Sequence, residues 1–311
     1  MKTISVVIPN YNGIDLLEKN IPPLIEALVF AKTRWEIIVV DDASTDLSVS
    51  FVKTKYSDII VLSNEKNMGF AETINRGIFL AQNDIVMALN TDVTVDKNVF
   101  EKILPRFNDF DVFAVTPNII DPRNGYNQAI YRLKPGFCWF TDRCVQLAKI
   151  DSRQEVPLFF SSGGSSCYDR QKLLQLGGFD PIYKPFYVED VDLSYRAWKA
   201  GWRCVLEPGC SVLHEANTTI SKYNKRRKIK FIAAKNKIIF LWLNISDVKL
   251  VFLYILFFLP SLVWDIVSFR KYKLIGTFMA FCHLPEVVRA RRKRKALFLV
   301  KDFEIIKRVS L

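Results

Sequence analysis

The chain has 311 residues, with 44 Lys and Arg against 32 Asp and Glu side chains, and a mean hydropathy of +0.11. Half of the residues are hydrophobic, which excludes an intrinsically disordered chain. Residues 1–221 hold 23 basic and 27 acidic side chains, whereas residues 222–311 hold 21 basic and 5 acidic ones. This uneven distribution argues against a protein that coats nucleic acid. It predicts a near-neutral folded domain over 1–221 and a basic, apolar helical segment over 222–311.

Strand and helix patterns alternate over the first hundred residues. Short apolar runs predict buried strands at 4–8, 36–40, 58–62 and 84–89. Helical spacing predicts helices at about 14–30, 46–56 and 69–82. The alternation predicts an α/β fold with right-handed crossovers and a doubly wound, mostly parallel sheet. In such sheets ligands bind beyond the carboxyl ends of the strands.

The segments that follow the predicted strands are polar and carry more acidic than basic groups. They are Pro9–Gly13, Asp41–Asp46 and Asn90–Asp92. The sequence has neither a Gly-x-Gly-x-x-Gly motif after the first strand nor a P-loop, so the usual phosphate-binding loops are missing. A nucleotide bound here would need a cation between its phosphates and these carboxylates.

Seven short motifs occur in order between residues 3 and 220. They cover 6–12, 39–46, 67–77, 89–92, 177–180, 189–192 and His214. Each motif alone is weak, but the ordered set resembles the family 2 inverting glycosyltransferases with the GT-A fold. The resemblance is strongest to the rhamnosyltransferase-like branch that builds bacterial surface polysaccharides. It implies transfer of a sugar from a nucleoside diphosphate donor to an acceptor hydroxyl.

The resemblance implies a nucleotide-sugar site on the loops after the strands. Asp42 would accept the N3–H of uracil or thymine, which implies a UDP- or dTDP-sugar, and Tyr11 would stack on the base. The alternative for Asp42 is a turn or cap carboxylate, although Asp46 suits the helix cap better. The expected nucleotide-sugar residues are Pro9, Tyr11, Asp41, Asp42, Gly69, Asn75, Asn90 and Thr91.

A metal site is expected at the segment after the fourth strand. Asn90-Thr91-Asp92 matches the family's Asp-x-Asp motif, with Asn in place of the first acid. The resemblance implies Asp92 and His214 as ligands of Mg²⁺ or Mn²⁺, and imidazole suits Mn²⁺ better than Mg²⁺. The alternatives are a polar turn and a structural histidine.

Three acids open a predicted helix at Glu189-Asp190-Val191-Asp192. The helix dipole alone favours acids in a first turn. An inverting transfer also needs a base for the proton of the acceptor hydroxyl. The resemblance implies Asp190 as this base, with Glu189 orienting it or the acceptor. The expected acceptor-side residues are Gly163, Gly178, Phe179 and Asp180, although glycine pairs also mark ordinary turns.

The C-terminal segment carries an almost purely apolar run at 250–264, flanked by basic clusters at 225–228, 270–273 and 291–295. As a helix, fifteen residues reach roughly 22 Å, short of the ~30 Å hydrocarbon core. The segment therefore predicts peripheral or monotopic binding to the cytoplasmic face of the bacterial inner membrane. One or two transmembrane helices in 238–284, or a buried core helix, are the alternatives.

A saccharide or lipid-linked acceptor fits this placement. One rival enzyme is a sugar-nucleotide pyrophosphorylase, but it would need a Gly-rich basic loop that Pro9–Gly13 does not provide. The other rival is a non-catalytic sugar-binding or scaffolding relative. Asn90 supports that rival, whereas Asp92, Asp190 and His214 oppose it.

Overall fold

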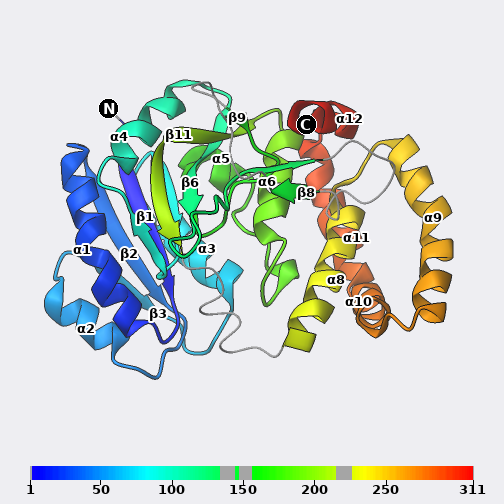
Figure 1. Ribbon diagram of the computed structural model, residues 1–311, viewed down its shortest axis with the longest axis horizontal. Helices are drawn as coiled ribbons and strands as arrows, with labels where there is room; N and C mark the ends of the chain where they lie inside the picture. Colours follow the sequence, from blue (N-terminus) through cyan, green and yellow to red (C-terminus); the bar gives the residue numbers. More distant parts are fainter. Residues whose placement is uncertain (1, 134–143, 147–155, 215–225, 311) are drawn as a thin grey trace.

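The computed structural model describes residues 2–133, 144–146, 156–214 and 226–310 (Figure 1). The strands are β1 Ile4–Asn10, β2 Trp35–Asp41, β3 Ile60–Ser63, β4 Ile85–Leu89, β5 Val93–Val95, β6 Val112–Ile120, β7 Tyr131–Leu133, β8 Cys144–Gln146, β9 Val156–Pro157, β10 Ser165–Asp169 and β11 Arg203–His214. The helices of the first part are α1 Ile14–Phe30, α2 Ser48–Lys55, α3 Phe70–Leu80, α4 Val99–Ile103, α5 Arg170–Gln175 and α6 Glu189–Lys199. Those of the second are α8 Arg226–Asn244, α9 Val248–Val267, α10 Lys271–Cys282, α11 Leu284–Arg294 and α12 Asp302–Val309.

The central sheet has the order β3-β2-β1-β4-β10-β6-β11-β5, with β9 paired to β11. The strands β3, β2, β1 and β4 are parallel, because α1, α2 and α3 each connect one of these strands to the next and return the chain to the same edge. Strand β10 runs antiparallel between β4 and β6. The prediction of a doubly wound, mostly parallel sheet is confirmed, and all four predicted strands lie in it.

The sheet positions the loops of the site. Asn10 pairs with Asp41 at the ends of β1 and β2, and Val7 of β1 pairs with Ala88 of β4. The side chains of these strands are almost all buried, which explains their continuous apolar runs. The carboxyl ends of β1, β2 and β4 therefore meet at one edge, where the sequence places its polar residues.

The C-terminal helices pack against the sheet domain rather than extending from it. In Figure 1, α8 and α11 lie between the sheet and α9, and α9 forms the outer edge of the molecule. Lys199 of α6 and Asp302 of α12 form a buried ion pair of 2.9 Å. Asp302 also accepts a hydrogen bond from Tyr195 at 2.6 Å. The predicted domain boundary at residue 221 lies outside the described residues and stays a prediction. The contacts of α6 with α12 attach the C-terminal helices to the sheet domain.

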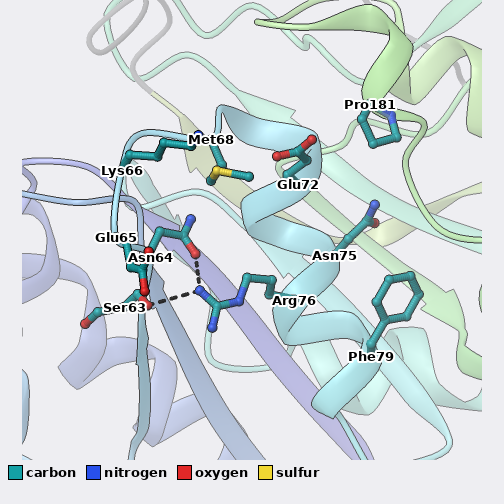
Figure 2. Close-up of a pocket in the computed structure, with 10 residues that line it drawn as sticks. All are labelled: Ser63, Asn64, Glu65, Lys66, Met68, Glu72, Asn75, Arg76, Phe79 and Pro181. Carbon is teal, nitrogen blue, oxygen red and sulfur yellow. Dashed lines mark hydrogen bonds between the residues drawn. The ribbon is translucent and has the colours of Figure 1, made fainter.

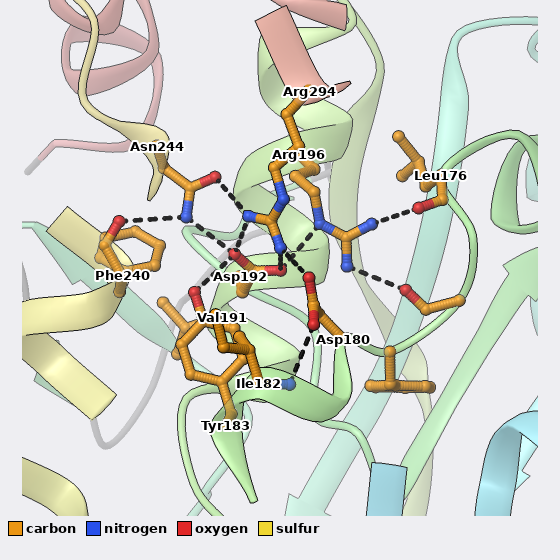
Figure 3. A network of polar contacts seen from close by, with 12 residues as sticks. Leu176, Asp180, Ile182, Tyr183, Val191, Asp192, Arg196, Phe240, Asn244 and Arg294 are labelled. Atoms are coloured by element: carbon orange, nitrogen blue, oxygen red, sulfur yellow. Dashed lines mark hydrogen bonds and ion pairs between the residues drawn. The ribbon is translucent and has the colours of Figure 1, made fainter. Parts of the chain in front are cut away.

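A buried polar network joins α6 to the C-terminal helices (Figure 3). Asp192 of α6 accepts hydrogen bonds from Arg196 at 2.7 Å and from Arg294 of α11 at 2.6 Å. Burial alone would raise the pKa of Asp192, but the charges of Arg294 and Arg196 hold it below its ordinary value. Arg294 belongs to the basic cluster that we expected at a membrane surface. The structure corrects this expectation, because Arg294 is buried and satisfies two carboxylates.

Helix α9 is longer than the sequence pattern indicates. It spans 20 residues, or about 30 Å at 1.5 Å per residue, instead of the fifteen residues of the apolar run. Among the described residues it is the one helix that is long and apolar enough to cross a membrane. Most of its large apolar side chains are exposed, including Phe252 and Leu259, which are 62% and 66% exposed.

Candidate active site

Asp41 and Asp42 are both buried at the end of β2, but they hold different loops. Asp41 Oδ1 accepts from Asn10 Nδ2 at 2.8 Å and from Ser44 Oγ at 2.6 Å, which fixes the turn after β2. Asp41 is therefore committed to this turn. Pro9 pairs with Val40 just before it.

Asp42 faces the loop that leads into α3. It accepts hydrogen bonds from the backbone N–H of Met68 at 2.7 Å and of Gly69 at 3.0 Å, and from Asn64 Nδ2 at 2.7 Å. A carboxylate offers about four acceptor positions. Three of them are occupied within the protein, so one position is left for a donor such as the N3–H of a pyrimidine. Tyr11 lies half-buried in the loop after β1.

A cavity of about 640 Å³ is lined by the loop after β3 and by α3 (Figure 2). Asn64 lines it and joins it to the site, because the side chain of Asn64 accepts a hydrogen bond from Arg76 and donates one to Asp42. The lining residues include Asn75 but neither Asp92 nor any residue of the 189–192 motif. The cavity therefore lies beside the candidate site, not within it.

Asp92 and His214 come together as the sequence predicts. Asp92 follows β4, His214 ends β11, and the distance from Asp92 Oδ1 to His214 Nε2 is 3.7 Å. The Nδ1 atom of His214 lies 2.9 Å from Gln128 Oε1. Because an amide oxygen accepts hydrogen bonds, this contact suits the tautomer with a proton on Nδ1, in which Nε2 is available as a metal ligand beside Asp92. The pair fits a divalent cation whose other ligands are water and phosphate oxygens.

The segment Ser162–Gly164 lies between Asn90 and the candidate base Asp190. A Cβ atom on Gly164 would lie 2.3 Å from Asn90 Nδ2, and one on Gly163 would lie 3.2 Å from Asp190 Cβ. The backbone N–H of Asn90 donates to the carbonyl of Gly164 at 2.8 Å. The two glycines therefore allow Asn90 and the start of α6 to approach the same backbone segment closely, and a side chain at Gly164 would displace the Asn90 amide. The carbonyl of Thr91 accepts from Asn20 at 2.7 Å.

Glu189 and Asp190 begin α6 in an environment that favours their protonated forms. Burial, with the neighbouring charge of Asp190 as a second cause, raises the pKa of Glu189 to about 8. Burial also raises the pKa of Asp190, although the N–H groups of Val191 and Gly163 oppose the shift. The backbone before them has left-handed φ values of 73° at Tyr187 and 78° at Val188. Such values are rare for a β-branched residue.

Asn236 of α8 holds this left-handed segment in place. Its side-chain amide donates to the carbonyls of Phe186 at 2.9 Å, of Tyr187 at 2.8 Å and of Tyr183 at 2.6 Å. The strained segment that presents Glu189 is therefore supported by a residue from the C-terminal helices. We expect a positioning role for Asn236.

We expect Glu189→Gln to change how stability depends on pH. In the folded protein Glu189 keeps its proton up to a pKa of about 8, whereas its ordinary value is 4.5. The folded state therefore binds more protons between these values, and unfolding becomes easier as the pH rises through this window. Relative to wild type, Glu189→Gln should gain at least about 1.4 kcal/mol from pH 5 to pH 9, the equivalent of one pKa unit. Urea unfolding at several pH values measures this, with the exposed Glu65→Gln as the unchanged control.

The candidate acceptor-side turn is held by side chains that we expected elsewhere. Asn75 Nδ2 donates to the Phe179 carbonyl at 2.7 Å, and Asn75 Oδ1 accepts from the Phe179 N–H at 2.9 Å. Gly178 is next to this contact, since its Cβ would lie 2.4 Å from Asn75 Oδ1. We predicted that Asn75 binds the nucleotide sugar, but both the oxygen and the nitrogen of its side-chain amide form hydrogen bonds with the Phe179 backbone in this turn. Asp180 accepts from the N–H of Ile182 and pairs with Arg294, so it also stabilises the fold.

Four residues around the site escaped the sequence analysis. Gln128 and Arg294 lie far along the chain from the groups they contact, and no local pattern marks such partners. Asn64 follows the short strand β3, a position where a polar residue could have been noticed. Asn236 interrupts the buried face of α8, which is a second signal that the sequence contained.

The comparisons with known proteins identify the family of the chain. The family model "Glycosyl transferase family 2" matches residues 5–174, more than half of the chain. A pre-mycofactocin glycosyltransferase of Mycobacterium tuberculosis is 29% identical over 73% of this chain and 45% of its own length. An N-acetylglucosaminyl-diphospho-decaprenol L-rhamnosyltransferase of the same organism is 27% identical over 57% of this chain and 66% of its own. The chain thus spans about half to two thirds of these relatives.

Solved structures share the fold at low sequence identity. GalNAc-T7 with UDP, GalNAc and Mn²⁺ aligns with a TM-score of 0.61 and 17% identity, over 86% of this chain and 58% of the other. Staphylococcus aureus TarS with UDP-GlcNAc gives a TM-score of 0.60 and 16% identity, over 96% and 84%. Both are glycosyltransferases of the GT-A type, so the fold is that of this class. Fold, ordered motifs and family match agree, and the chain belongs to glycosyl transferase family 2.

Proposed function

We propose that the protein is an inverting glycosyltransferase that moves a sugar from a UDP- or dTDP-sugar to a hydroxyl of a lipid-linked saccharide, in the assembly of a bacterial surface polysaccharide. The observation that carries this proposal is the placement of Asp190. Its carboxylate lies against the Gly163 backbone, across the glycine pair from Asn90, and its pKa is raised. A raised pKa brings a general base closer to working pH.

Asp190 would take the proton of the acceptor hydroxyl while the hydroxyl oxygen attacks the anomeric carbon. The new bond forms as the bond from that carbon to the diphosphate oxygen breaks, and the nucleoside diphosphate leaves with the electron pair. Attack from the opposite face inverts the anomeric configuration. Glu189, protonated up to a pKa of about 8, would donate a hydrogen bond that orients the acceptor or Asp190.

The donor would lie across the carboxyl ends of β1, β2 and β4. Asp42 has one acceptor position left for a pyrimidine N3–H, which supports a UDP- or dTDP-sugar. Asp92 and His214 would hold Mg²⁺ or Mn²⁺, which neutralises the leaving diphosphate when bound. The complex of the structurally similar GalNAc-T7 with UDP, GalNAc and Mn²⁺ supports this assignment.

Gln128→Ala should weaken metal binding without removing a ligand. The hydrogen bond of Gln128 to Nδ1 fixes the orientation of the His214 ring, and loss of such a partner typically costs about 10–100-fold in metal affinity. The concentration of Mn²⁺ that gives half-maximal nucleoside diphosphate release should rise by this factor, with release at saturating Mn²⁺ retained. The exposed Gln175→Ala is the matched control, and an unchanged Mn²⁺ requirement in Gln128→Ala would contradict the role.

The exposed face of α9 and α10 supports binding to the cytoplasmic face of the inner membrane. The Asp247 N–H, at the start of α9, donates to Asp302 of α12 at 2.7 Å. At the other end of α9, a turn of three residues leads into α10, which packs on α8. Both ends of α9 are therefore attached to the same body. A helix attached at both ends suits a position in the plane of the interface, with the basic residues of α8 and α10 near anionic headgroups.

Vesicle flotation tests this membrane proposal. Phe252→Glu with Leu259→Glu places two charges on the exposed face of α9. Burial of each such apolar side chain is worth about 1.5–3 kcal/mol, so binding to anionic vesicles should weaken by at least about a hundredfold. Leu47→Glu with Phe110→Glu is the control, because these residues are 71% and 89% exposed on the sheet domain. Equal loss in both double variants would contradict a membrane face on α9.

The proposed activity itself is tested with a panel of nucleotide sugars. Release of nucleoside diphosphate is followed with and without Mn²⁺, first with water and then with lipid-linked saccharides as acceptors. Turnover confined to UDP- or dTDP-sugars and increased by a lipid-linked acceptor is the expected result. Absence of binding and turnover for every donor would favour the non-catalytic alternative.

A further inference from the structure

A second cavity, of about 330 Å³, lies among α8, α9 and α10, away from the candidate active site. Its walls are largely apolar and include Ile238 and Leu241 of α8 with Phe258 and Leu262 of α9. Helices α8 and α10 approach closely at one point, where a Cβ on Gly276 would lie 2.6 Å from Ala234 Cβ. The two helices touch at this point, and the cavity lies beside it. The volume is at the small end of ligand sites, about 300–1,000 Å³.

The same cavity carries an excess of positive charge. Lys230 and Lys237 of α8 and Lys273 of α10 line it, against a single lining carboxylate, Asp265 of α9. Asp265 already faces Arg270, with 3.6 Å between Oδ1 and Nη1. The ammonium groups of Lys230 and Lys273 beside an apolar wall suit a molecule with an anionic head and a hydrocarbon chain. Free inorganic phosphate would match only the cationic part.

Helix α8 connects this cavity to the candidate base. Its cavity face carries Lys230, Lys237 and Leu241. Its opposite face carries Asn236, which holds the segment before Glu189, and Lys235, whose Nζ donates to the Lys184 carbonyl at 2.9 Å. The cavity and the segment that leads to Glu189 therefore lie on opposite faces of α8. An acceptor that reaches both sites would pass around this helix, with its anionic head on one side and its reacting hydroxyl on the other.

We propose that this cavity binds the phosphate group and the first hydrocarbon units of the acceptor's polyprenyl anchor. The inference rests on the lipid-linked acceptor proposed above, and it names the site that would hold its lipid end. The rest of the hydrocarbon chain would continue along the exposed face of α9 into the bilayer. Recognition is then specific for a polyprenyl phosphate and distinct from general attraction to anionic lipids.

Equilibrium binding of the full chain to two kinds of vesicle tests this site. One contains a long-chain polyprenyl phosphate in phosphatidylcholine, and the other contains phosphatidylglycerol at the same surface charge. Wild type should prefer the first by at least about tenfold, the worth of one charge-assisted hydrogen bond. Lys230→Glu with Lys273→Glu should abolish this preference. The matched control, Lys249→Glu with Lys271→Glu, changes the charge equally at exposed positions outside the cavity lining and should keep the preference.

A second variant tests whether the space in the cavity is needed, independently of its charge. Ala233→Phe puts a larger side chain into the cavity wall without changing the charge, and it should lose the preference while binding phosphatidylglycerol vesicles as wild type does. Equal preference in Ala233→Phe and wild type, or equal loss in both charge variants, would overturn the inference. Donor turnover with water as acceptor is measured in parallel. If turnover is normal while the preference is missing, the cavity assignment alone is wrong, whereas absence of donor binding and turnover refutes the proposed function.

Discussion

Asp190→Asn is expected to lower sugar transfer by about 10²–10⁴-fold, the usual contribution of a general base. Asparagine has the same shape, and its oxygen can still accept from the Val191 N–H, now at 2.8 Å from Asp190 Oδ1. The amide cannot take the acceptor proton at working pH. The fall should appear in kcat, measured as nucleoside diphosphate release at saturating acceptor, with donor affinity unchanged.

Two comparisons sharpen this test. The exposed Asp58→Asn should retain full activity, which controls for the change of charge. Donor affinity is measured separately by equilibrium binding of the nucleotide sugar. If transfer and donor binding are both unchanged in Asp190→Asn, then Asp190 is not the base.

Arg294→Met is expected to destabilise the protein by about 3–5 kcal/mol, because it removes one of the two guanidinium partners of a buried carboxylate. Asp192 is fully buried, and Arg294 is its only partner from α11 in the network of Figure 3. Arg196, Tyr183 and Asn244 still donate to Asp192 in this variant, but none of them belongs to α11 or can hold it in place. Urea unfolding in detergent measures the loss.

The neighbouring residue provides the control for this prediction. Arg292 lies on the same helix but is exposed, so Arg292→Met should change stability by no more than about 0.5 kcal/mol. Equal effects in the two variants would show that the loss comes from the helix surface, not from the ion pair. Asp192→Asn should be destabilising as well, because it leaves two buried guanidinium groups with a weaker acceptor.

The alternating half of the fold was predictable because its signals are local. Strands β1 and β4 are apolar runs buried on both faces, and such runs are visible in the sequence without knowledge of their partners. The approach of Asp92 and His214 followed from ordered motifs. By contrast, Asn75 contacts Phe179 across 104 residues, and hydrophobic periodicity contains no information about such pairings.

The acids of the 189–192 motif show the same limit. The sequence presents them as one cluster in a first helical turn. The structure divides them, because the helical turn directs Asp192 toward Arg196 and Arg294 while Glu189 and Asp190 face the site without a basic partner at hydrogen-bonding distance in the described contacts. Which side of a helix meets an arginine from a distant segment depends on tertiary packing.

The left-handed segment at Tyr187 and Val188 also has a consequence for how the protein is made. Such backbone conformations cost of order 1–3 kcal/mol each and persist only when their surroundings impose them. Asn236, which supports them, lies 49 residues beyond Tyr187, and Arg294 lies 102 residues beyond Asp192. Because synthesis proceeds from the N-terminus, we expect the sheet to form on the ribosome well before the base is in place. The candidate base would then reach its final position only after α8 and α11 have been synthesised.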